Sequence, residues 1–184
     1  MTALSMASVP FTLTVTAAAQ GRSDPAAARA LFTEARQLAG EKKFDQACPK
    51  FEESQRLDPG IGTLFNLADC WDRIGRTASA WARFLDVAAA ARGAGQAERE
   101  RVARDRASKL EPKLSRLTLQ VQSPASGERV SKDGVDIGAA EWGTPVPSDP
   151  GDHVIEATAP GKKAWKTTTA LATGGAKVVV TVPA

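Results

Sequence analysis

Apolar and small residues recur every three or four positions from residue 25 to about residue 114, with polar residues between them. This spacing is typical of amphipathic helices that pack on one another. The pattern predicts helices over residues 25–39, 45–57, 63–74 and 77–92, followed by a long, charge-rich helix over 96–114. Asp24 and Pro25 form a start signal for the first helix, because aspartate caps free amides and proline suits the first helical position.

Five positions of this helical region recur with a period of 33 residues. Leu31, Ala35, Leu38, Ala47 and Phe51 are followed by Leu64, Ala68, Trp71, Ala80 and Phe84. Small residues where helices approach closely, with large residues where they interdigitate, are typical of stacked helix pairs. The repeat therefore predicts two α-hairpins stacked side by side, an architecture that favours binding over catalysis.

The repeated residues resemble the tetratricopeptide repeat (TPR) family. The first copy of the family pattern is carried by Leu31, Ala35, Leu38, Phe44, Ala47, Phe51 and Pro59, and the second by Leu64, Leu67, Ala68, Trp71, Gly75, Ala80 and Phe84. The second copy departs from the pattern at Thr77 and Arg92. The resemblance implies two repeats closed by residues 96–114 as a capping helix, and we expect the rest of the chain to help cover that helix.

The resemblance to TPR proteins also implies a concave groove lined by the first helix of each pair. The groove positions of the family correspond here to Phe32, Arg36, Phe65, Asp69, Asp72 and Arg73. Two phenylalanines among mixed charges would suit a peptide segment or a partner helix. The alternative is that both phenylalanines pack against neighbouring helices. The lysines with which other members clamp a terminal carboxylate are not apparent, which weakens a chaperone-type role.

Beyond about residue 115, apolar and polar residues alternate strictly, as in Leu117, Leu119 and Val121 with polar residues between them. A period of two indicates a half-buried strand. Strands are predicted over 117–121, 128–132, 152–159, 163–171 and 177–182, with turn signals between them. Short strands at this spacing predict a small antiparallel β-sandwich.

The turns of this second region resemble the PEGA domain family in order and spacing. The matching residues are Ser123, Pro124, Gly127, Val130, Asp133, Gly134, Gly143, Thr144, Pro145, Pro150, Gly151, His153, Val154, Pro160 and Gly161. The naming motif is degraded at residues 124–128, and residues 139–142 look inserted. The resemblance implies a transthyretin-like β-sandwich, common in exported envelope proteins, and no known activity.

Composition supports a division into a helical repeat domain over 25–114 and a sandwich domain over 115–184. Ala, Arg, Leu and Glu dominate up to about Arg116, whereas Val, Thr, Gly and Pro dominate after it. The 24 basic and 21 acidic residues give a net charge of +3. This is an ordinary protein surface without a basic stripe, so nucleic acid is not an expected partner.

Residues 1–19 carry no charged side chain and run from an apolar stretch into three alanines. This resembles the core and cleavage site of a secretory signal peptide, which predicts export to the periplasm or cell envelope. The positive leader is missing, and the alternative is a disordered tail. The apolar run is too short and interrupted for a membrane-spanning helix, which needs about 20 apolar residues.

Cys48 and Cys70 lie on helices that should pack side by side. In an exported protein they would form a disulfide, and closing this loop would stabilise the fold by roughly 3 kcal/mol. The alternative is two small buried thiols.

Catalytic chemistry has few candidate residues in this chain. His153 is its single histidine and has no nucleophile motif nearby, so we expect a structural role at the start of a strand. A metal site would need Cys48, Cys70 and His153 to converge without a close pair of ligands. We therefore expect no enzyme activity, metal or cofactor.

The sequence favours an exported adaptor in which the helical repeats bind a protein partner and the sandwich spaces or anchors them in the envelope. The alternative function is a glycan-binding module in which Trp142 or Trp165 stacks on sugar rings. Against that alternative, both tryptophans are expected to be core residues.

Overall fold

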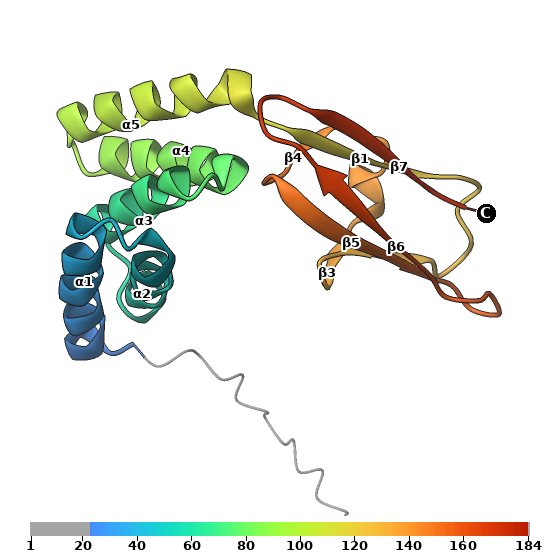
Figure 1. Cartoon of the computed structure of the whole chain (residues 1–184), viewed down its shortest axis with the longest axis horizontal. Helices are drawn as coiled ribbons and strands as arrows, with labels where there is room; N and C mark the ends of the chain where they lie inside the picture. Colours follow the sequence, from blue (N-terminus) through green and yellow to red (C-terminus); the bar gives the residue numbers. More distant parts are fainter. Residues whose placement is uncertain (1–22, 184) are drawn as a thin grey trace, which may run out of the picture.

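The computed structural model describes residues 23–183, and the predicted signal segment 1–19 lies outside them. A stack of helices is followed by a two-sheet β-domain (Figure 1). The helices are α1 (Pro25–Gly40), α2 (Phe44–Leu57), α3 (Ile61–Arg73), α4 (Thr77–Gly93) and α5 (Ala97–Leu110), with a 3₁₀ turn η1 (Glu111–Lys113). The strands are β1 (Arg116–Val121), β2 (Arg129–Lys132), β3 (Val135–Ile137), β4 (Val146–Pro147), β5 (Gly151–Thr158), β6 (Trp165–Leu171) and β7 (Lys177–Val182).

The predicted α-hairpins are confirmed by the burial of the small repeat residues. Ala35, Ala47, Ala68 and Ala80 are all 0% exposed and belong to one hydrophobic cluster. Helix α1 packs on α2, α3 on α4, and α5 on α4. A side chain larger than alanine at these positions would force the helices apart.

A pair of phenylalanine rings packs between the two helices of each hairpin, at equivalent positions of the repeat. The rings of Phe32 and Phe51 meet edge to face with centroids 5.7 Å apart. The rings of Phe65 and Phe84 repeat this arrangement at 5.5 Å. Such pairs contribute about 0.5–1.5 kcal/mol beyond the burial of their area.

The end of the helical region differs from the sequence prediction. Helix α5 ends at Leu110 and the chain continues as a 3₁₀ turn, because Pro112 cannot take part in a continuous α-helical ladder. The expectation was that the sandwich helps to cover this last helix, but α5 packs mainly on α4. The sandwich instead contacts the first turn of α4, through hydrogen bonds between Ser79 and Asp149.

The β-domain consists of two sheets, with strand orders β4-β1-β7 and β3-β2-β5-β6 (Figure 1). The second sheet is antiparallel throughout, as predicted. The first is mixed, because β7 runs parallel to β1 from the pair Arg116 and Lys177 to the pair Val121 and Val182. Strands β3 and β4 escaped prediction because three and two residues are too short to show alternation.

The sandwich core follows from the alternation of its strands. The residues buried between the sheets are Leu117, Leu119, Val121, Val130, Ile155, Ala157, Val180 and Val182. Val179 points the other way and is 64% exposed, as the two-residue period requires.

Candidate partner-binding face

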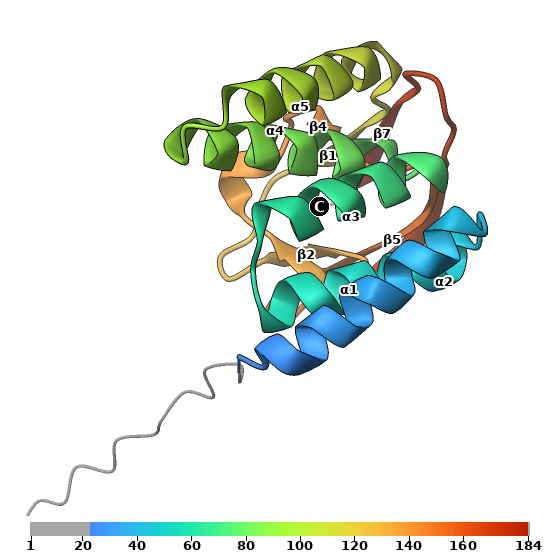
Figure 2. The same cartoon turned by 90° about the vertical axis from the view of Figure 1, so that its left-hand side faces the viewer.

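The six groove positions from the sequence lie on α1 and α3, and we call them the α1/α3 face: Phe32, Arg36, Phe65, Asp69, Asp72 and Arg73. Viewed from the helical side, α1 and α3 lie in front and the strands lie behind them (Figure 2). Helix α4, by contrast, borders the sandwich, where Ala78, Trp81 and Ala82 line a shared hollow. Helices α1 and α3 therefore lie in front of the sandwich in this view, whereas α4 borders it.

The two phenylalanines of this face pack against neighbouring helices, which is the alternative that the sequence left open, and they remain partly exposed. Each packs edge-on against an aromatic ring of the following helix, yet each is only partly buried. Phe65 also lines a shallow hollow of about 780 Å³ with the start of α5. The other residues around this hollow are Gln96, Ala97, Glu98, Arg99 and Val102.

The acidic positions of the face are already engaged within the chain. Arg106 of α5 donates to the carboxylates of both Asp69 and Asp72, at 3.1 Å for Asp72. Its guanidinium also lies 4.9 Å from the centroid of the Phe84 ring. Burial alone would lower the pKa of Arg106, but the two carboxylates raise it above its ordinary value. Asp69 and Asp72 therefore attach α5 to α3 and are poorly placed to receive a partner.

Two arginines of the face remain accessible. Arg36 is exposed and forms no ion pair with any residue in the part of the chain that the structure describes. Arg73 is exposed and forms an ion pair with the Asp69 carboxylate at 3.7 Å, beyond hydrogen-bond distance. Of these two arginines, Arg36 therefore carries the charge without an ion-pair partner among the described residues.

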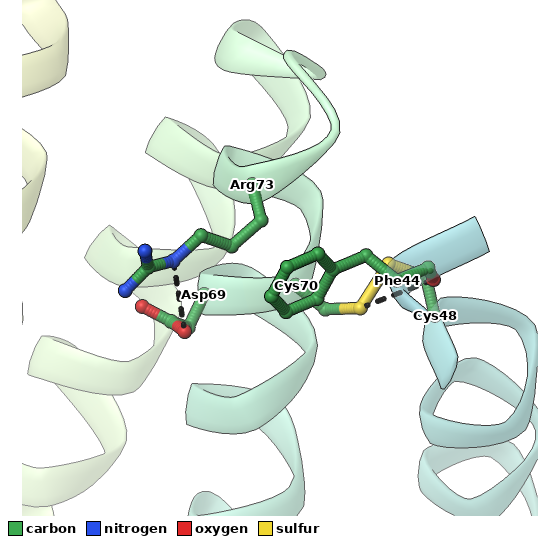
Figure 3. The surroundings of a disulfide bond; sticks show 5 residues. All are labelled: Phe44, Cys48, Asp69, Cys70 and Arg73. Atoms are coloured by element: carbon green, nitrogen blue, oxygen red, sulfur yellow. Dashed lines mark hydrogen bonds and ion pairs between the residues drawn. A yellow bond between two sulfur atoms is a disulfide. The ribbon is translucent and has the colours of Figure 1, made fainter. Parts of the chain in front are cut away.

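A disulfide joins the two hairpins (Figure 3). It connects Cys48 of α2 to Cys70 of α3, whose Cα atoms lie 5.6 Å apart. Cys70 Sγ also lies 3.6 Å from the Phe44 carbonyl oxygen, but a disulfide sulfur has no proton to donate, so this is a contact only. Asp69 and Arg73 point away from the bridge, toward the other side of α3 (Figure 3). The disulfide thus fixes α3 without obstructing the α1/α3 face.

A second constellation joins the helices to the sandwich, and we call it the domain joint: Arg76, Ser79, Asp133, Asp149 and His153. The Asp149 carboxylate accepts hydrogen bonds from the Ser79 amide at 2.9 Å, the Ser79 hydroxyl at 2.5 Å and Arg76 Nε at 3.1 Å. The Arg76 guanidinium also lies 4.4 Å from the Trp71 ring centroid.

His153 supports the joint from the sandwich side. Its Nδ1 lies 2.7 Å from Asp133 Oδ2, and its Nε2 lies 2.8 Å from the Asp149 carbonyl oxygen. The side chain is 10% exposed. The predicted structural position of this histidine agrees with its burial, but the sequence did not indicate that it supports a contact between domains.

Trp142 and Trp165, the two tryptophans considered for the alternative glycan-binding function, differ in their surroundings. Both pack against the sandwich core. Trp142 has a buried indole Nε1 with no hydrogen-bond partner among the described residues. Trp165 borders two surface hollows, of about 390 and 410 Å³. Both tryptophans are partly buried, and Trp165 is the one of the two that borders these hollows.

Within residues 23–183, no group of three or more His, Cys, Asp or Glu side chains is arranged to hold a metal ion. None of the helices described there has the length and apolar character needed to cross a bilayer.

No protein-family model matches the chain, and no curated protein matches it. The resemblance of residues 115–184 to PEGA domains therefore stays a prediction. Among solved structures, the chain is similar to the first TPR domain of Spaghetti (RPAP3), solved with the HSP90 peptide SRMEEVD. The identity is 19%, the coverage is 50% of this chain and 85% of that chain, and the TM-score is 0.35. A similarity at this level does not assign the chain to a family.

Proposed function

We propose that this protein is a non-enzymatic adaptor that binds an extended peptide segment of a partner protein on its α1/α3 face. The observation that carries the proposal is the combination of partly exposed aromatic rings with Arg36, which forms no ion pair in the described part of the chain. Phe32 and Phe65 offer apolar contacts, whereas Arg36 offers an unneutralised charge. Such a surface fits a peptide that carries both apolar and acidic side chains.

The hollow beside Phe65 is the place for the apolar side chain. Arg99 and Val102 also line this hollow, so a leucine- or phenylalanine-sized group would lose water contact there. Asp69 and Asp72 are not part of this proposed contact, because Arg106 already neutralises them. The proposed partner-contacting residues are therefore Phe32, Arg36, Phe65 and Arg73, a smaller set than the six positions from the sequence.

The proposed setting is the periplasm or cell envelope, where the sandwich would space or anchor the helical module. The disulfide supports this, since such bonds persist mainly in oxidising compartments. The apolar residues 1–19 support it as well, through their resemblance to a signal peptide.

An array of acidic and basic extended peptides, probed with the purified full chain, tests the binding proposal. Arg36→Ala should lower the affinity for the peptides that bind about tenfold, because it removes a positive charge from the face. Arg56→Ala is the matched control, since Arg56 is equally charged but pairs with Glu53 on α2. Equal binding by the two variants would contradict the proposal.

The glycan-binding alternative depends on Trp165 and its two hollows. Trp165→Ala should then abolish binding of the full chain to cell-wall material. Retention of that binding would exclude Trp165 as a stacking platform.

A further inference from the structure

The first turn of α4 lacks a cap of its own. Its N-cap residue is Arg76, whose side chain accepts no hydrogen bond, and the helix has no acidic residue in its first turn. The four leading amides of a helix need acceptors, and the positive end of the helix favours a carboxylate nearby. The sandwich supplies this group, because Asp149 Oδ1 accepts the Ser79 amide. A residue 70 positions away thus serves as the cap of α4.

The loop that carries Asp149 is held by His153. One ring nitrogen faces the Asp133 carboxylate and the other faces the Asp149 carbonyl oxygen. Both partners are acceptors only, and a neutral imidazole has a single N–H. The doubly protonated, cationic ring is the form that donates to both.

The charged side chains around the His153 ring belong to β2 and the turn after it, to the Asp149 loop, and to the residue that precedes α4. Asp133 follows β2 and also accepts the Val154 amide at 2.9 Å, and Lys132 of β2 donates to Ser148 beside the same hollow. Arg76 from the helical side is neutralised by the Asp149 carboxylate. Asp152 and the remaining joint residues supply no further donor or acceptor to the ring. Among the side-chain types present here, histidine is the one that can gain or lose a proton in the physiological pH range.

We propose that His153 is a pH-responsive latch between the helical repeats and the sandwich. In its cationic form the ring holds the Asp149 loop in the conformation that caps α4. When the ring loses a proton, one nitrogen lone pair faces an acceptor, and the loop and its cap are released. The two parts of the chain are therefore tightly joined in acidic surroundings and loosely joined in alkaline ones.

Hydrogen exchange of the Ser79 amide measures the latch directly, because this amide is bonded to Asp149. In the full chain its protection factor, which is corrected for the intrinsic pH dependence of exchange, should fall roughly fivefold from pH 5.5 to pH 8, the equivalent of about one hydrogen bond. The Ala47 amide in α2 is the internal reference, since its acceptor is the carbonyl of Lys43, the N-cap residue of that helix. An equal protection of Ser79 at the two pH values would overturn the proposal.

Two variants give opposite expectations. In His153→Gln the ring charge is absent, so Ser79 should be weakly protected at both pH values. In Asp133→Asn the side-chain amide donates to Nδ1 while its oxygen still accepts the Val154 amide, so a neutral ring satisfies both contacts. Ser79 should then stay protected at both pH values. A wild-type pH response in either variant would refute the latch, and Asp133→Asn decides the matter if His153→Gln does not fold.

Discussion

Phe51 and Phe84 occupy equivalent positions in the two hairpins, and each is met edge-on by the phenylalanine of the preceding helix. Around this common core the two hairpins differ. The first exposes Arg36 on its outer face, whereas the corresponding residue of the second, Asp69, is bound by Arg106. The repeat thus preserves the packing and varies the surface. Equivalent positions in the two repeats can therefore support the same packing and still present different side chains at the surface.

The largest expected effect comes from truncating the ring at the centre of each hairpin. Phe51→Ala and Phe84→Ala should each lower the free energy of unfolding by about 3–5 kcal/mol. Phe84→Ala should cost more, because the Arg106 guanidinium also stacks on its ring. Urea titrations of the two variants measure the difference. A larger loss for Phe51→Ala would show that the second hairpin gains nothing from α5.

Removal of the bridge between the hairpins should have the next largest effect. The double variant Cys48→Ala, Cys70→Ala opens a loop with a sequence separation of 22 residues. The expected loss is about 3 kcal/mol in urea under non-reducing conditions. The untreated and reduced wild-type proteins are the controls. A variant as stable as the oxidised wild type would mean that packing alone fixes α2 against α3.

Arg106→Ala and Arg36→Ala compare the stability contribution of an ion-paired arginine with that of an arginine that has no ion-pair partner among the described residues. Arg106→Ala should cost about 1–2 kcal/mol, because it removes the hydrogen bonds to two carboxylates and a stacked cation. Arg36→Ala should change stability by less than about 0.5 kcal/mol, as at other exposed sites. Thermal unfolding of both variants checks this order. Equal losses would show that Arg36 has a structural partner.

The smallest effect concerns the acid stability of the sandwich. Burial tends to raise the pKa of Asp133, but hydrogen bonds from His153 and the Val154 amide lower it below its ordinary value near 3.8. An aspartate whose pKa is lower in the folded than in the unfolded protein stabilises the fold at pH values above its unfolded-state pKa. This stabilisation is lost as the pH falls through the folded-state pKa. Melting temperatures between pH 2 and 5 should therefore decline less steeply in Asp133→Asn. An identical decline would mean that Asp133 does not contribute.

The sequence was sufficient to predict the hairpins because their signal is local and repeated. Ala35 and Ala68 recur 33 positions apart on faces of helical period, and all that the fold requires of them is small size. The parallel pairing of β1 with β7 could not be predicted in this way, because alternation shows which face of a strand is buried and not which strand lies beside it.

Parts of the site escaped prediction for a similar reason. Arg106 lies in a helix crowded with charges, where nothing distinguishes the arginine that reaches α3. The joint left a weak signal, because Arg76 is a poor residue at the start of a helix and Asp149 is a good cap. No pattern in the sequence brings these two residues together, since they are 73 positions apart.

Site-specific photo-crosslinking in intact cells that produce the protein tests the central claim, that a partner binds the α1/α3 face. A photoreactive residue at position 36 on α1 should crosslink to a protein partner, whereas the same residue at position 56 on α2 or at position 165 on β6 should not. The first position lies on the proposed face, the second is exposed on α2, and the third borders the hollows of the sandwich. Crosslinks at position 56 or 165 without any at position 36 would contradict the account.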